Sequence, residues 1–212
     1  YNDGKLILAN SDKYTYTATE TGNYAVQVVS GSCTAISDEK EVIPGGTIPT
    51  PKLDIFPESK NICEENGVVV ISLKSSNDYA GATYQWYKND QKITANANDI
   101  LYTATEAGKY SLHILTSDGC GVMTAEIDVT KDGGSIADVD LDVFPEDGRI
   151  VNNTPVEMEV LNAGDYGSAT YYWFKGNDIV ESGTGKVRFD AATTGKYKVL
   201  IVDGNNCAVW SR

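Results

Sequence analysis

The sequence predicts an all-β protein made of tandem β-sandwich units, and two observations carry this prediction. Landmark residues recur with a period near 87, which is typical of a chain of repeated domains. Between the landmarks, apolar and polar residues alternate with a period of two, as they do in strands with one face on a core. No stretch shows the 3.6-residue period of a long helix. We therefore expect about seven short strands in each complete unit.

Three kinds of landmark define the repeat. Trp86-Tyr87-Lys88-Asn89-Asp90 recurs as Trp173-Phe174-Lys175-Gly176-Asn177, and Tyr1-Asn2-Asp3-Gly4 reads as the same segment without its Trp. We take Tyr1, Tyr87 and Phe174 as the starts of the three segments. A Gly-x-Tyr begins twenty-one residues after each start, with its tyrosine at Tyr24, Tyr110 or Tyr197. A cysteine follows each of these, at Cys33, Cys120 or Cys207. The starts are 87 − 1 = 86 and 174 − 87 = 87 residues apart, so the three registers agree.

The strands of one unit can be followed in order. A β-branched run at 68–73, with a counterpart at 156–161, predicts the second strand. Residues 83–87 and 169–174 predict the third strand, with Trp86 and Trp173 on the core face. Tyr110, Leu112 and Ile114 alternate with polar residues and predict the sixth strand. Buried tryptophans and the tyrosines Tyr24, Tyr110 and Tyr197 are therefore the expected structural core.

Gly- and Pro-rich segments at 44–51 and 131–135 predict linkers between the units. The expected domains are 1–43, 52–130 and 139–212. The first of these is the C-terminal half of a truncated repeat, which would leave Tyr16, Tyr24, Val26 and Val28 facing water. We therefore expect the sequence to begin inside a longer polypeptide.

A Trp on the third strand and a Gly-x-Tyr at the sixth resemble an immunoglobulin-like domain. Glu106-Ala107-Gly108-Lys109-Tyr110 resembles the Asp-x-Gly-x-Tyr-x-Cys motif of that fold, in which the tyrosine hydroxyl ties down the corner before the strand. The cysteine of that motif is Leu112 here. The Trp-Tyr-Lys-Asn-Asp segment, Gly119-Cys120 and the early Cys63 are similar to immunoglobulin-like tandem repeats of large secreted surface proteins of the Bacteroidetes type.

The four cysteines, in a β protein of extracellular type, are expected to form disulfides. One candidate pair is Cys63 with Cys120, inside the middle repeat. An immunoglobulin-like topology puts these two at opposite poles of strands ~23 Å long, whereas bridged Cα atoms lie within ~7 Å. The geometry favours Cys63 with Cys207, which would link the abutting poles of adjoining repeats. Cys33 and Cys120 would then bond to residues upstream of the sequence. Both pairings stay open at this point.

Composition excludes several classes of function. The chain has 212 residues, with 17 basic and 30 acidic side chains and a net charge of 17 − 30 = −13. Nucleic-acid binding needs clustered Lys and Arg, which are absent here. No apolar run approaches the ~20 residues of a membrane span. The only histidine, His113, falls on the outward phase of its strand, so we expect no catalytic constellation and no enzyme.

Two weaker candidate sites remain. The acidic segment before the third repeat holds Asp138, Asp140 and Asp142, whose oxygens could bind calcium at a domain junction. A solvated acidic linker is the alternative, and no cofactor is otherwise expected. Asp78-Tyr79 and Asp165-Tyr166 place a tyrosine beside an acid in the loop before the Trp strand, which suits sugar stacking. Packing at the joint is the alternative for both tyrosines.

The sequence predicts a non-catalytic, acidic repeat region that acts as an extended spacer or adhesive stalk of a secreted cell-surface protein, with an unknown glycan or protein partner. A second hypothesis is a carbohydrate-binding or accessory module of a secreted polysaccharide-degrading enzyme. A pilus-like subunit completed by a donor strand is a third. The ligand and the oligomeric state are not predicted.

Overall fold

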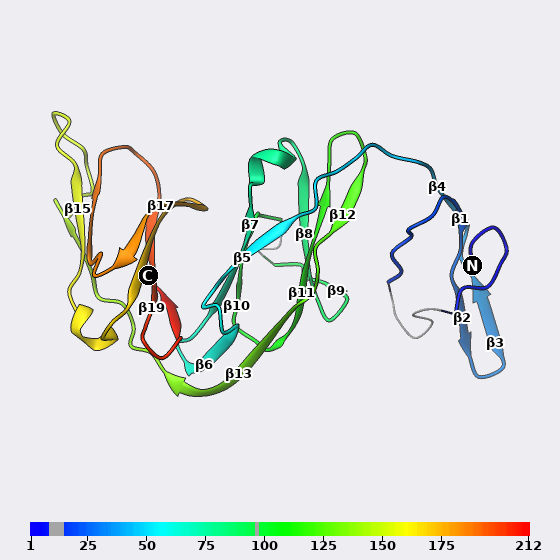
Figure 1. Ribbon diagram of the computed structural model, residues 1–212, viewed down its shortest axis with the longest axis horizontal. Helices are drawn as coiled ribbons and strands as arrows, with labels where there is room; N and C mark the ends of the chain where they lie inside the picture. The colour runs from blue at the N-terminus through cyan, green and yellow to red at the C-terminus, as the bar shows by residue number, and fades with distance from the viewer. Residues whose placement is uncertain (9–14, 96–97) are drawn as a thin grey trace.

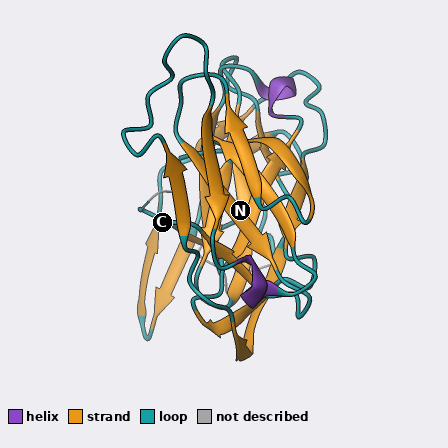
Figure 2. Cartoon of the chain, turned by 90° about the vertical axis from the view of Figure 1, so that its left-hand side faces the viewer, coloured by secondary structure: helices purple, strands orange, loops and turns teal. Residues whose placement is uncertain are grey.

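The computed structural model describes residues 1–8, 15–95 and 98–212. It confirms the all-β prediction: strands make up the ordered elements, and the described residues contain no α-helix. Two short 3₁₀ turns, η1 (Ser76–Tyr79) and η2 (Ala163–Tyr166), stand at equivalent places in two units. Figure 2 shows how far strands dominate the molecule. No helix in the described part of the chain has the length and apolarity to span a membrane.

The middle unit is a sandwich of two sheets. One sheet has the order β10-β7-β5, and the other has the order β6-β13-β11-β8-β9 with β12 paired to β11. Their bounds are β5 (Lys52–Phe56), β6 (Asn61–Glu65), β7 (Val69–Lys74), β8 (Thr83–Lys88), β9 (Gln91–Lys92), β10 (Leu101–Ala104), β11 (Gly108–Leu115), β12 (Gly121–Met123) and β13 (Ile127–Ser135).

The third unit repeats this plan with seven strands. Its sheets have the orders β14-β15-β18 and β17-β16-β19-β20. Their bounds are β14 (Leu141–Phe144), β15 (Val156–Val160), β16 (Thr170–Lys175), β17 (Asp178–Thr184), β18 (Arg188–Ala191), β19 (Tyr197–Val202) and β20 (Ala208–Trp210). Alternating side chains from the two inner faces fill the core, as expected of an immunoglobulin-like sandwich.

The N-terminal unit is smaller. Its described strands form two antiparallel pairs, β1 (Gly22–Tyr24) with β4 (Lys40–Val42) and β2 (Gln27–Ser30) with β3 (Cys33–Ile36). These strands correspond to the sixth and seventh strands of the other units. Val26 and Val28 are 58% and 60% exposed, whereas their counterparts Leu112 and Ile114 are fully buried.

The repeat landmarks have equivalent surroundings in the two complete units. Trp86 and Trp173 are both fully buried. Each donates its indole N–H to a carbonyl thirteen residues later, Asp99 in one unit and Lys186 in the other, at 2.8 Å in both cases. A ring on the fifth strand, Tyr102 or Phe189, lies 5.6 Å from the indole in either unit. The 87-residue period therefore marks one packing unit.

All three Gly-x-Tyr segments form the same corner. The hydroxyl of Tyr110 donates to the carbonyl of Glu106 at 2.8 Å, and that of Tyr197 donates to Thr193 at 2.7 Å. Tyr24 donates to the carbonyl of Glu20 at 3.0 Å. Each bond spans four residues and fixes the turn that enters the strand.

The segment between the middle and third units differs from the expected linker. Residues 131–135 belong to β13, which continues past the middle unit's core and pairs in parallel with β6. Thr130 lies opposite Asn61, and Asp132 lies opposite Cys63. Backbone hydrogen bonds of a sheet thus replace a Gly-rich flexible connection, because β6 offers a free edge along this segment.

The units adjoin through the faces of their sheets. In Figure 1 the strands run across the long axis of the molecule, and the sheets follow one another along that axis. The pole-to-pole stacking expected from the sequence is therefore wrong. Apolar residues on the outer faces of the sheets account for the difference, as the junction between the units makes clear.

Candidate functional site

The most developed feature outside the two cores is the junction between the middle and third units. The outer face of β5-β7-β10 covers the outer face of β16-β19-β20 (Figure 1). Five buried residues form what we call the junction cluster: Val70, Leu101, Phe174, Leu200 and Ala208. Burying a side chain of this size stabilises by about 1.5–3 kcal/mol. The cluster therefore holds the two sandwiches together as one packed body.

Strands that are buried on both faces explain how this junction is encoded. In β7, Val69 and Ile71 face the core of their own unit, while Val70 faces the junction. In β19, Val199 and Ile201 face inward and Leu200 faces the junction. A continuous apolar run is the sequence signature of a strand covered on both sides. The run at 68–71 carries this signature, which by periodicity alone predicts a strand but not what covers its second face.

Aromatic side chains border the junction cluster. Phe56 of β5 lies 4.6 Å from the ring of Tyr172, and Phe174 meets Trp210 edge-on at 5.0 Å. Lys198 places its ammonium 3.8 Å from the centre of the Trp210 ring. Burial lowers the pKa of Lys198 and raises that of Tyr172. Both residues are half-buried, so the border of the junction is partly withdrawn from water.

Polar groups pair across the same junction. The backbone N–H of Val68 donates to the carbonyl of Ala208 at 2.9 Å. The indole of Trp210 donates to Thr103 Oγ1 at 3.1 Å, and Asn177 donates its amide to Asp99 at 2.6 Å. Polar groups at and around the interface thus pair with each other, which restrains the relative orientation of the two sheets.

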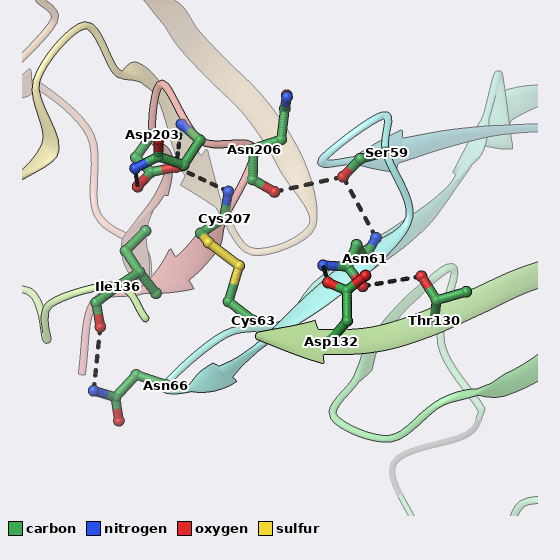
Figure 3. Close-up of a disulfide and its surroundings, with 11 residues drawn as sticks. Ser59, Asn61, Cys63, Asn66, Thr130, Asp132, Ile136, Asp203, Asn206 and Cys207 are labelled. Atoms are coloured by element: carbon green, nitrogen blue, oxygen red, sulfur yellow. Dashed lines mark hydrogen bonds between the residues drawn. A yellow bond between two sulfur atoms is a disulfide. The ribbon is translucent and has the colours of Figure 1, made fainter. Parts of the chain in front are cut away.

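A disulfide closes one end of the junction (Figure 3). Cys63 of β6 bonds to Cys207, with their Cα atoms 5.7 Å apart. This confirms the inter-unit pairing and excludes the Cys63–Cys120 alternative. The pole-to-pole reason given for it is wrong, because Cys63 reaches Cys207 across adjoining sheets. Gly134 lies beside the bond, and a Cβ there would stand 3.5 Å from the sulfur of Cys63.

Hydrogen bonds around the disulfide join the middle unit to the linker and to the third unit. Asn66 donates its side-chain amide to the carbonyl of Ile136 at 3.3 Å, and Ser59 donates to the carbonyl of Asn206 at 3.4 Å (Figure 3). The amide of Cys207 donates to the carboxylate of Asp203 at 2.8 Å. Cys207 therefore lies in a turn that is stabilised by a hydrogen bond to Asp203. Bond, linker and turn form one connected structure.

Tyr79 and Tyr166 do not form the exposed platform that sugar stacking would require. Both are buried, in the η1 and η2 turns. The Tyr79 hydroxyl donates to the carbonyl of Pro49 at 2.8 Å, and the Tyr166 hydroxyl donates to that of Asp138 at 2.8 Å. Each tyrosine thus anchors the linker that enters its unit, as the packing alternative expected. Asp78 and Asp165 stand beside them on these turns.

The acidic segment before the third unit is dispersed. Asp138 pairs with Arg212 at 2.6 Å, and Asp142 lies on β14 opposite Glu159. Asp140 donates its backbone N–H to Asn162. Among the residues the structure describes, no group of three acidic, histidine or cysteine side chains is placed to hold a metal ion. Asp138, Asp140 and Asp142 are therefore not brought together as calcium ligands would have to be.

His113 lies in a different setting from the expected solvated one. It is half-buried and lines an open pocket of about 500 Å³ between the middle unit and residues 15–18. Burial lowers its pKa. Ser111 lines the same pocket, but no hydrogen bond joins it to His113, and alternate residues on one strand face stand roughly 7 Å apart. A nucleophile–base pair requires direct contact, which these two lack.

Comparison with known proteins gives little further identity. No protein-family model and no curated protein sequence matches the chain. Among solved structures, the chain is similar to fibronectin(III)-like modules of Clostridium thermocellum CbhA, at 12% identity and a TM-score of 0.29, over 74% of this chain and 89% of that one. It is also similar to a chain of a cytokine receptor complex, at 9% identity and a TM-score of 0.25, over 76% of this chain and 100% of that one.

Proposed function

We propose that this chain is a non-catalytic segment of β-sandwich repeats that acts as a stiff spacer, or adhesive stalk, in a secreted cell-surface protein. The junction between the middle and third units is the observation that carries the proposal. A spacer has to hold distance and direction, and this junction restrains both through an apolar cluster, paired polar groups and a covalent bond.

The disulfide and the charge support the proposed location outside the cell. Structural disulfides persist in oxidising compartments and are rare in the cytosol. The net charge of −13 favours solubility and opposes self-association of long polypeptides. The resemblance of the repeat to immunoglobulin-like tandem repeats of large surface proteins of the Bacteroidetes type agrees with this location.

The alternative of a carbohydrate-binding module loses its proposed platform, because Tyr79 and Tyr166 are buried. We therefore favour the mechanical role. A ligand of the stalk, whether glycan or protein, would have to use other surfaces than these two turns.

Backbone ¹⁵N relaxation tests the stiffness directly. In the natural chain, amides of the middle and third units should give one rotational correlation time, because a packed junction makes them tumble together. The matched variant combines Cys63→Ser, Cys207→Ser and Phe174→Asp, which removes the bond and charges the junction cluster. That variant should give two separate correlation times. Independent tumbling of the units in the natural chain would contradict the proposal.

A further inference from the structure

A second face of the molecule repeats the design of the junction, but the residues that the structure describes cover only part of it. It is the outer face of β8, β11 and β12 in the middle unit. The strand registers place Tyr87, His113, Gly121 and Met123 at the positions that Phe174, Leu200, Ala208 and Trp210 hold in the third unit. We call these four residues the open face. In the third unit the equivalent face is covered by β5, β7 and β10.

Among the residues that the structure describes, one irregular segment of the N-terminal unit, Thr15–Ala18, lies against the open face. Residues Thr15–Ala18 line the pocket above Tyr87, His113 and Met123. In the repeat register these residues correspond to Leu101–Ala104 of β10, the strand that supplies Leu101 and Thr103 to the junction. The pocket of about 500 Å³ therefore lies where strands like β7 and β5 would stand. Met123, at 36% exposed, borders this space.

Cys120 stands at the edge of the open face in the same turn as Cys207. The N–H of Thr116 donates to the carbonyl of Cys120 at 2.9 Å, and the N–H of Asp203 donates to the carbonyl of Cys207 at 2.9 Å. The linker passes both cysteines with a Gly-Gly pair: Gly46 donates its N–H to Cys120 Sγ at 3.3 Å, and Gly134 lies beside the Cys63–Cys207 bond. Cys120, however, is a free thiol.

The N-terminal unit supplies the complementary surface. Val26 and Val28 are more than half exposed, whereas the same positions in the middle unit are sealed by β7 and β8. The backbones of Tyr1 and Ala25 exchange hydrogen bonds of 2.9 and 3.3 Å. This is the register of Tyr87 and Ser111 in the β8–β11 ladder. Tyr1 is therefore held as one residue of a β8-like strand.

We propose that the open face and the exposed side of the N-terminal unit together form a docking site for the front half of a repeat of this kind. The occupant is a polypeptide with the pattern of residues 52–86: two strands like β5 and β7, a β8-like strand ending in Trp, and a cysteine at the position of Cys63. Its β7-like strand fills the pocket against His113 and Met123, its Trp covers Val26, and its cysteine bonds to Cys120.

The covalent step is an oxidation of two thiols. The occupant's thiol and Cys120 each lose a proton and together lose two electrons as the S–S bond forms. A small-molecule disulfide such as oxidised glutathione accepts them and is released as two thiols. Docking places the two sulfurs within bonding distance, as Cys63 and Cys207 already are in the other junction.

The test joins a copy of residues 52–86 to Tyr1 of the full chain, because this length restores the repeat register. The copy carries Glu64→Asp, so that its tryptic peptide 61–74 differs in mass from the natural one. After folding in a glutathione buffer, non-reduced peptide mapping should find the marked peptide 61–74 linked to peptide 110–131, which contains Cys120. The natural peptide 61–74 should remain linked to Cys207, which checks that the rest of the chain is folded.

A matched control separates docking from mere tethering. The same chain with Val70→Asp in the copy keeps the cysteine but charges the strand that should face His113. We expect the linked fraction to fall at least fivefold. Hydrogen exchange at residues 24–30 gives a readout without cysteine chemistry, and it should slow at least tenfold only when the unaltered copy is present. Equal linkage with and without Val70→Asp, a bond to Cys33, or unchanged exchange at residues 24–30 would each overturn the proposal.

Discussion

The two junctions of this chain use the same positions of the repeat and reach opposite states. At the middle–third junction, Phe174 and Leu200 are fully covered and Cys207 is bonded. At the N-terminal–middle junction, the equivalent Tyr87 and His113 border an open pocket, and Cys120 is free. The repeat therefore places interface residues at the same positions of each unit. How much these residues stabilise a junction depends on which strands cover them.

Removing the disulfide should give the largest difference between the junctions. The Cys63–Cys207 bond closes 144 residues. The chain-entropy model assigns such a loop about 5 kcal/mol of stabilisation. We expect Cys63→Ser with Cys207→Ser to lower the free energy of unfolding by about 3–5 kcal/mol, measured by urea denaturation. The pair Cys33→Ser with Cys120→Ser should change it by less than ~0.5 kcal/mol. Equal losses in the two variants would show that the junctions do not differ as described.

Shortening equivalent aromatic side chains should give a smaller difference. Phe174 is almost fully buried in the junction cluster, so Phe174→Ala should cost about 3–4 kcal/mol of unfolding free energy. Tyr87 occupies the same register position on the open face and is only partly buried. Tyr87→Ala should therefore cost about 1 kcal/mol. Denaturant curves for the two variants check the comparison, and a Tyr87→Ala loss as large as that of Phe174→Ala would contradict it.

The smallest expected effect is a pH dependence of stability that arises from the tyrosine corner of the middle unit. Burial raises the pKa of Tyr110 from 10.0 to about 12, so its neutral form is favoured in the folded state. The stability that this shift contributes is fully present below pH 10 and is lost as pH rises towards 12. The middle unit should therefore weaken between pH 10 and 12 in denaturation experiments, and Tyr110→Phe should flatten that slope. An unchanged slope in Tyr110→Phe would assign the alkaline loss to other groups.

Short-range pattern predicted the parts of the fold that depend on one unit. Alternation around Trp86 and Trp173 identified the core strands, and the three Gly-x-Tyr segments identified the corners. These features depend on neighbours within one sandwich, where inward and outward residues alternate at a fixed period. The disulfide depends on a contact between units, so the sequence left two pairings open and only the structure showed that Cys63 bonds to Cys207.

From the amino-acid sequence one could predict the repeat, its strands, its buried tryptophans and its tyrosine corners. Three features came from the folded chain alone: sheets meet face to face, β13 runs on into the linker, and Tyr79 and Tyr166 anchor linkers instead of standing free. Alternation along a strand predicts which side chains point away from the core of their own unit. Whether an outward residue then meets water or another sheet depends on contacts between residues far apart in the chain.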